Sequence, residues 1–490
     1  MTRAKANPEI LSPDPHRFWG LGEVLALAWP ASLSMLSHTV MMFFDGIMVA
    51  SIGPDPLGAQ FVGGITSFIP AAFMFGVLTV VNTYVSQNLG AGRLERCGQY
   101  AWAGLTVALC FALLAQLLSI PAGAAMRAFG HGPRVAALEA MYFRYMLLNL
   151  IPMLMSKVLE QFFYGLGRSN VVLLSSFLAN AVNIFANWVL IYGHWGLPAM
   201  GLEGAAVGTV LGTLVMLGVL AAMFLSRRTH RRYATRRAGD MKLRECGEIL
   251  RIGWPAGVQF CADVLAWGMI TAFLIGKFGM DHLAANTTAI RYMSLSFMPA
   301  VGIGIATTAL VGRYIGESRP DLALRRVRAA LIAAVGYMGL CGLFFFLFRH
   351  ELVRFYISIA PSDVASAEIA ARVDSITHIG ARLLLCAAIF QVFDAAAIIY
   401  NGALRGAGDT FWPMVTTIAL CWLLQVGGGF TIVHNFPGLT SLGPWISASA
   451  FIVALSVVFC WRFESGQWRK IDLLKREELP PAPVDSTLEA

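Results

Sequence analysis

The chain has 490 residues, of which 57% are hydrophobic and only 13% are charged. Soluble globular proteins carry about 25% charged residues. The composition therefore excludes a soluble domain and predicts an all-α protein that crosses the membrane many times. The net charge of +8 could attract nucleic acid, but its distribution along the chain favours a different neighbour.

The chain starts with a polar arm, which we place at residues 1–23 on the cytoplasmic side. The stretch from Met1 to Phe18 contains NPEILSPDPH and lacks the apolar core of a cleavable signal peptide. We therefore expect the first hydrophobic span to direct membrane insertion.

The first span, near residues 24–52, contains two residues that a plain membrane anchor would not need. Pro30 removes a backbone donor and is expected to bend the helix. Asp45 places a carboxylate in the membrane, which costs about 2.5–3.5 kcal/mol at the bilayer centre. We therefore expect Asp45 to face a protein interior or a water-filled cavity, with His38 seven residues earlier on the same helical face.

Eleven further hydrophobic runs follow, separated by polar or Gly/Pro breaks. Each is long enough to cross the hydrocarbon as one helix, since about 20 apolar residues suffice. The twelve predicted spans lie near 24–52, 59–86, 98–121, 137–160, 170–192, 203–225, 248–276, 283–312, 325–348, 374–401, 411–433 and 444–462.

Lysine and arginine are distributed unevenly between the two sets of loops. One set, together with both termini, carries 25 of them and the other set carries 6. Because cytoplasmic loops of membrane proteins are enriched in Lys and Arg, this split predicts an even number of spans with both termini in the cytoplasm. Membrane lipid phosphate, and not nucleic acid, is the expected neighbour of the positive charge.

The basic segment 226–247 divides the chain into two halves that resemble each other. The matched pairs, at offsets of 225 or 226 residues, include Glu23 and Glu248, Pro30 and Pro255, Gly53 and Gly279, Val85 and Val311, and Gly90 and Gly316. Six spans per half give both copies the same orientation, and such repeats are typical of secondary transporters with a site between the halves. We predict an N-lobe at 24–225 (helices 1–6), a cytoplasmic loop at 226–247, a C-lobe at 248–463 (helices 7–12) and a cytoplasmic tail at 464–490.

Three carboxylates lie deep in the predicted spans: Asp45, Asp263 and Asp394. Ionisable groups inside a membrane are by default ion or substrate groups, so each is a candidate site for Na⁺ or H⁺. The alternative is a neutral acid that hydrogen-bonds a neighbouring helix. Asp263 is not the repeat mate of Asp45, because His38 aligns with Asp263 at the offset of 225 residues.

The fifth and sixth spans add neutral polar groups. Asn183 and Asn187 lie four residues apart and share a helix face, with Asn180 one turn earlier. Amide oxygens are hard ligands that suit Na⁺, much as carbonyl oxygens suit Ca²⁺. The alternative is hydrogen bonding between helices. Thr209 in the sixth span could add a hydroxyl, although its Gly and Ala neighbours indicate close helix packing.

Several motifs are absent from the sequence. It contains no GxxxxGK[ST] phosphate loop, no HExxH or GxSxG motif and no Cys/His cluster, so nothing suggests an ATP-driven pump, an enzyme or a zinc site. We expect no cofactor beyond a coupling ion. Lys157 and Glu160, three residues apart in the fourth span, are interpreted as a structural ion pair.

The chain resembles a known family over essentially all twelve spans, on the basis of six motifs. They are MMFFDGIMVASIG at 41–53, VSQNLGAG at 85–92, YGLGRSN at 164–170, NWVLIYGHWG at 187–196, GLEGAAVGT at 201–209 and, most specific, FQVFDAAAIIYNGALRGAGDT at 390–410. The sequence resembles the multidrug and toxic compound extrusion (MATE) transporters of the bacterial type.

The resemblance implies two pseudo-symmetric six-helix lobes in a V, with substrate in the cleft and antiport of organic cations against Na⁺ or H⁺. By motif, Asp45, Asn183, Asn187 and Thr209 match the cation site of the N-lobe, and Asp263 and Asp394 match acids of the C-lobe. Na⁺ is a possible ligand of all three acids. Pro30 matches a proline whose bending has been proposed to release substrate. The seventh-helix acid is commonly Glu in the family, and Asn187 is an acid in some relatives.

These features favour a secondary multidrug efflux transporter in the bacterial inner membrane, a monomer whose partners are small organic cations, drugs and membrane lipids. One alternative is a flippase for a lipid-linked oligosaccharide or another lipid, which would line its cleft with basic residues. The other is a non-transporting scaffold or sensor, which would tolerate loss of the buried acids.

Overall fold

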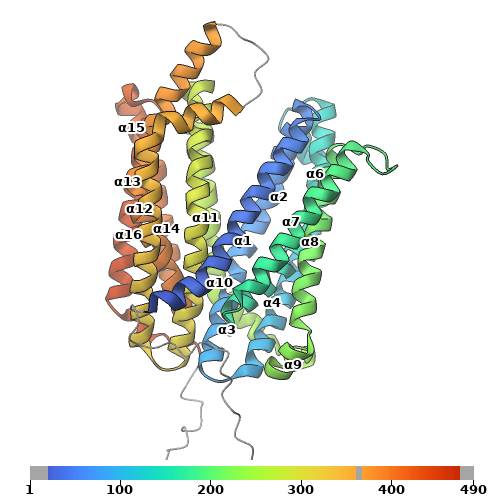
Figure 1. Cartoon of the computed structure of the whole chain (residues 1–490), viewed down its shortest axis with the longest axis vertical. Helices are drawn as coiled ribbons and strands as arrows, with labels where there is room; N and C mark the ends of the chain where they lie inside the picture. The colour runs from blue at the N-terminus through green and yellow to red at the C-terminus, as the bar shows by residue number, and fades with distance from the viewer. Residues whose placement is uncertain (1–19, 360–366, 475–490) are drawn as a thin grey trace, which may run out of the picture.

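The computed structural model describes residues 20–359 and 367–474. Within these ranges, twelve helices are long and apolar enough to cross a membrane, which confirms the predicted number. The N-terminal arm up to residue 19 and the last part of the tail, residues 475–490, lie outside the described residues. Figure 1 shows two bundles that meet at the lower end and separate toward the upper end.

The first bundle, which corresponds to the predicted N-lobe, contains six membrane spans. Its helices are α1 (Leu21–Ala50), α2 (Pro54–Leu78), α3 (Val80–Gly90), α4 (Leu94–Ala115), α5 (Ala122–Arg127), α6 (Pro133–Gly165), α7 (Ser169–Tyr192) and α8 (Leu202–Phe224). Only Thr79 separates α2 from α3, and together they form one span of residues 54–90. The short helix α9 (Arg227–Tyr233) follows in the basic loop at the lower end of the molecule (Figure 1).

The second bundle corresponds to the predicted C-lobe. Its helices are α10 (Leu243–Met269), α11 (Met280–Gly316), α12 (Pro320–Ile359), α13 (Ala367–Ala407), α14 (Phe411–Leu420), α15 (Gly428–Asn435) and α16 (Leu442–Glu464). Two spans contain π-helical turns, at Ile270–Ile275 after α10 and at Cys421–Gly427 between α14 and α15. Such turns interrupt the regular hydrogen-bond ladder and frequently occur at functional sites.

The first helix of each half packs on the second helix of the other half. In α1, Ser32 donates a hydrogen bond to the carbonyl of Pro299 in α11 at 2.7 Å, and Gly302 leaves no room there for a side chain. The repeat-related helices α10 and α2 cross equally closely, and there Gly76 packs on the backbone of Ala256. Small residues at both crossings let the backbones approach closely.

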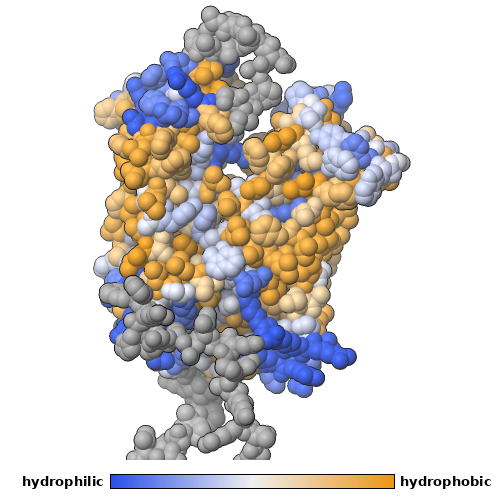
Figure 2. Space-filling view, in the orientation of Figure 1, coloured by the Kyte–Doolittle hydropathy of each residue, from blue (hydrophilic) through white to orange (hydrophobic). Residues whose placement is uncertain are grey.

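The surface has the distribution expected of a membrane protein. Figure 2 shows a broad apolar belt around both lobes, with hydrophilic surface concentrated at the two ends. It also shows the surface recessed between the lobes toward the upper end. The lobes are therefore packed together at the end that carries α9 and open at the other end.

Candidate functional site

The Asp45 carboxylate lies at the contact between α1 and α7. It is only 8% exposed, and its Oδ1 accepts a hydrogen bond of 2.6 Å from Nδ2 of Asn187. Tyr142 of α6 is buried close enough to interact electrostatically with it. Asp45 thus faces the protein interior, as the cost of placing a carboxylate in lipid requires.

Asn187 links the carboxylate to the neighbouring amide. Its Nδ2 also lies 3.5 Å from Oδ1 of Asn183, one turn earlier on α7. Both asparagines are fully buried, and Oδ1 of Asn187 and Nδ2 of Asn183 have no hydrogen-bond partner in the described structure. An unpaired buried oxygen beside a carboxylate is a suitable ligand for a hard cation.

The fourth predicted member of this site, Thr209, and the nearby Asn180 have different partners. The hydroxyl of Thr209 donates to the carbonyl of Ala205 within its own helix, at 3.0 Å. Asn180 donates to the hydroxyl of Ser37 on α1 at 2.6 Å. The structure therefore joins three of the predicted side chains directly and leaves Thr209 outside their hydrogen-bond network.

In the second lobe, Asp263 of α10 and Asp394 of α13 lie close enough for the charge of one to act on the other. Both are half-buried, and neither carboxylate makes a hydrogen bond or ion pair with another described side chain. Two like charges in a medium of low dielectric constant repel each other, and a bound cation or proton relieves that repulsion.

Buried glutamines in the second lobe were not singled out by the sequence. Gln391, three residues before Asp394, donates to the hydroxyl of Ser296 at 2.6 Å. Gln259 of α10 donates to the hydroxyl of Thr417 at 3.0 Å. Gln425 lies in a π-helical turn, fully buried, and both polar atoms of its side chain lack a partner in the described structure. Gln391 and Gln259 each lie one helical turn before an intramembrane acid, and this spacing could have singled them out from the sequence.

The predicted ion pair of the fourth span is present. Nζ of Lys157 lies 3.1 Å from Oε2 of Glu160, with both side chains largely buried, and the ammonium also lies over the ring of Phe75 at 5.2 Å. His38 is within electrostatic range of this pair, whereas the hydrogen-bond partner of Asp45 is Asn187. Pro30 is buried inside α1, which runs without interruption from Leu21 to Ala50.

At the lower end, an ion pair joins the two lobes. Oε2 of Glu23, in the first turn of α1, accepts a hydrogen bond of 2.6 Å from Nε of Arg326 in α12. The hydroxyl of Tyr314 in α11 donates to the same oxygen at 2.8 Å. The Arg326 side chain is 3% exposed and the Glu23 side chain 14% exposed. Removal of one partner would leave an uncompensated buried charge, so separating the lobes at this end requires both groups to find other partners.

The repeat provides a second contact of the same design. Oε2 of Glu248, the mate of Glu23, accepts a hydrogen bond of 2.5 Å from the hydroxyl of Tyr100 in α4. Tyr100 occupies the position of Arg326 at the offset of 226 residues. The other oxygen of Glu248 pairs with Arg244 of its own helix at 3.0 Å. Each first-helix glutamate therefore reaches the third span of the opposite lobe.

Comparisons with known proteins agree with this architecture. The MatE family model matches residues 30–189 and 255–431. A probable multidrug resistance protein NorM of Mesorhizobium japonicum is 29% identical over 454 residues, covering 92% of this chain and 95% of that protein. The multidrug resistance protein NorM of Burkholderia vietnamiensis is 28% identical over 465 residues, covering 94% and 96%.

Solved structures show the same fold. An outward-facing multidrug resistance MATE family transporter of the MOP superfamily superposes with a TM-score of 0.81 at 22% identity, covering 92% of this chain and 97% of that chain. A MOP superfamily transporter from Pyrococcus furiosus, described as having a binding pocket of reverse polarity, gives a TM-score of 0.82 at 20% identity and the same coverage.

Proposed function

Because this chain belongs to the MatE family, we propose that it exports organic cations in exchange for Na⁺ or H⁺, by alternating access between its two lobes. It is a multidrug efflux transporter with twelve membrane helices, and not an enzyme. We place it in the bacterial inner membrane as a monomer with both termini in the cytoplasm, and we take residues 24–225 and 248–463 as the moving lobes. The uneven distribution of Lys and Arg supports this orientation.

The observation that carries the proposal is the environment of the three intramembrane acids. Asp45 is held by Asn187, beside an unpaired amide oxygen. Asp263 and Asp394 are close together and are free of any described cationic partner. A protein that used these carboxylates only to join helices would pair them with donors in both lobes. In one lobe they are instead left available for an external cation.

The contacts at the lower end can be either formed or open, and these are the two states that alternating access needs. Glu23 with Arg326, and Glu248 with Tyr100, join the lobes there. Access from that end requires both contacts to open. A cation that binds one state more tightly than the other shifts this equilibrium by its difference in affinity, and an imposed gradient then drives substrate the opposite way. The comparisons do not favour the flippase alternative, since the named relatives are multidrug resistance proteins.

The experiment uses the full chain in proteoliposomes loaded with ethidium, under an inward Na⁺ gradient in one set and an inward H⁺ gradient in the other. Flux that depends on either gradient supports antiport and identifies the ion. The double variant Asp45→Asn, Asp394→Asn should lose gradient-driven ethidium flux. Undiminished, ion-independent flux in that variant would overturn the proposal. Absence of flux in both arms with folded wild-type protein would favour lipid translocation.

A further inference from the structure

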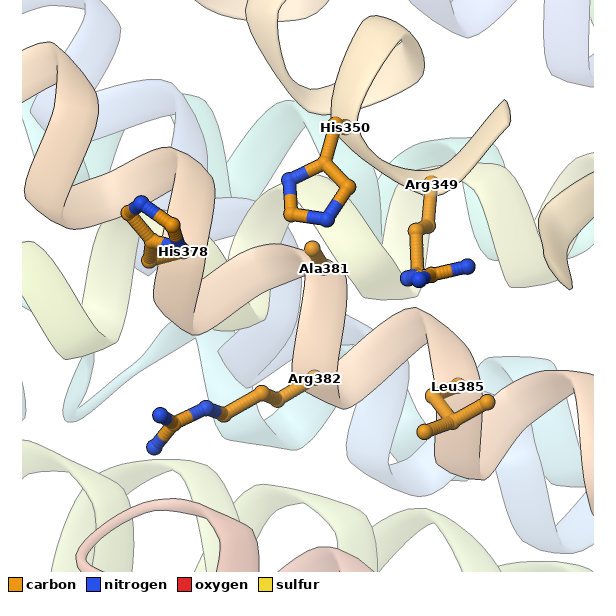
Figure 3. A pocket seen from close by; sticks show the side chains of 6 residues that line it. All are labelled: Arg349, His350, His378, Ala381, Arg382 and Leu385. Atoms are coloured by element: carbon orange, nitrogen blue, oxygen red, sulfur yellow. The ribbon is translucent and has the colours of Figure 1, made fainter. Parts of the chain in front are cut away.

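A basic pocket lies at the upper end of the second lobe, away from the acids described above. It has a volume of about 240 Å³ and is lined by Arg349, His350, His378, Ala381, Arg382 and Leu385. Figure 3 shows the two arginines and two histidines arranged around the small side chain of Ala381, from two neighbouring helices. None of the lining residues is acidic.

The fold explains how two of these side chains reach the pocket. The backbone of α12 leaves helical geometry at Phe348, with φ −107° and ψ 19°. Immediately after this kink, Arg349 donates from Nη1 to the carbonyl of Phe346 at 2.5 Å. Guanidinium has five N–H donors, so most of them remain available. The bend thus positions Arg349 and His350 against α13.

The other basic residues form a stripe on α13. His378 and Arg382 are four residues apart and share a face. The ring centroid of His378 lies 5.8 Å from that of His350, and its Nε2 lies 3.7 Å from the exposed Asp374. Asp374 is also the partner of Arg354. Arg382 has no ion-pair partner among the described residues, in contrast to Arg326 and Arg462, which pair with carboxylates.

The surface below the pocket is apolar and exposed. On α12, Leu340 is 68% exposed and Leu347 is 57% exposed, and both precede the kink, on the side of the membrane centre. On α13 the stripe continues through Leu385 to Ile389, which is 61% exposed. Both helices therefore change from basic to apolar in the same direction. This is the pattern of a phospholipid, with a phosphate at one end and acyl chains alongside the helices.

We propose that this pocket binds the phosphate of an anionic phospholipid in the leaflet opposite the basic loop. Arg349 and Arg382 supply charge-assisted hydrogen bonds, the rings of His350 and His378 each offer an N–H donor, and the exposed leucines and isoleucine contact the acyl chains. The assignment does not depend on which ion drives transport.

The test is lipid binding to the purified, delipidated full-length protein by native mass spectrometry, with phosphatidylglycerol, phosphatidylcholine and inorganic phosphate as probes. The variant Arg349→Gln, Arg382→Gln should bind phosphatidylglycerol about a hundredfold more weakly, at roughly tenfold, or about 1.4 kcal/mol, for each arginine. Arg354→Gln is the matched control, because Arg354 lies on the same helix end but does not line the pocket. Arg382→Lys should retain part of the affinity.

Three outcomes would overturn the proposal. Unchanged phosphatidylglycerol binding in the double arginine variant would show that the pocket is not the site. Equal binding of phosphatidylcholine would show that the apolar surface alone holds lipid. Competition by inorganic phosphate at the affinity of the lipid would identify a free-anion site instead. Unfolding temperatures of the variants, measured in the same detergent, verify that each one is folded.

Discussion

The two halves of this protein repeat one scaffold but carry different charged groups on it. At one repeat position the first half has His38 and the second half has Asp263. At the candidate site of the first half, the acid is Asp45, which is buried and hydrogen-bonded to Asn187. The second half has two acids within range of each other and no described donor to either.

The contacts that join the halves have diverged much less. Glu23 and Glu248 are repeat mates, and each binds the residue at the same position of the opposite half, Arg326 or Tyr100. Both partners lie at the end where the lobes meet. The two inter-lobe contacts therefore keep the same repeat positions, whereas the buried polar groups of the two candidate sites differ.

The largest effect is expected at the joint. Glu23→Gln leaves the Arg326 charge buried without its carboxylate, and loss of one member of a buried pair costs about 3 kcal/mol. Glu248→Gln should cost only about 1 kcal/mol, because its charged partner Arg244 is 58% exposed. Thermal unfolding in one detergent measures both. Equal losses would show that the two contacts are equivalent, contrary to their geometry.

A companion variant separates charge from packing at the joint. Glu23→Gln combined with Arg326→Met removes both charges of the buried pair and should recover most of the lost stability. No recovery in the double variant would show that the contact acts through shape and not through charge.

The next effect concerns the two proposed ion sites. Asp45→Asn removes the only carboxylate of the first site, and we expect gradient-driven flux to fall at least about tenfold, or about 1.4 kcal/mol. Asp394→Asn leaves Asp263 in place and should reduce flux less while changing its dependence on the ion. Initial rates of ethidium flux in proteoliposomes measure both. A larger loss in Asp394→Asn would make the second lobe the dominant site.

The smallest effect is expected among the neutral groups of the first site. Asn187→Ala removes the donor to Asp45, and a lost hydrogen bond of this kind costs about 1 kcal/mol, which is a few-fold weaker apparent affinity for the coupling ion. Thr209→Val should have little effect, because the Thr209 hydroxyl already donates to the carbonyl of Ala205. The ion concentration that gives half-maximal flux, measured for both variants, distinguishes the effect of Asn187→Ala from that of Thr209→Val. A strong defect in Thr209→Val would show that the Thr209 hydroxyl takes part in ion binding.

Much of the candidate site could be predicted from the sequence, for a simple reason. Asp45, Asp263 and Asp394 are visible because an acid is rare within a long apolar run. The helix period also places Asn183 and Asn187 on one face. Gln425 is not visible in this way, because it has no intramembrane acid one turn away and a glutamine in a span does not by itself reveal whether its side chain is buried.

The sequence by itself determined the twelve spans, the twofold repeat and the intramembrane acids, because hydrophobic length, internal similarity and charge in an apolar run are all local properties. Only the tertiary structure decided which acid meets which partner. It joined Asp45 to Asn187, Glu23 to Arg326 and the kinked end of α12 to the basic stripe of α13. These contacts depend on helix crossings between residues far apart in the chain, and the spacing of residues within one helix does not encode them.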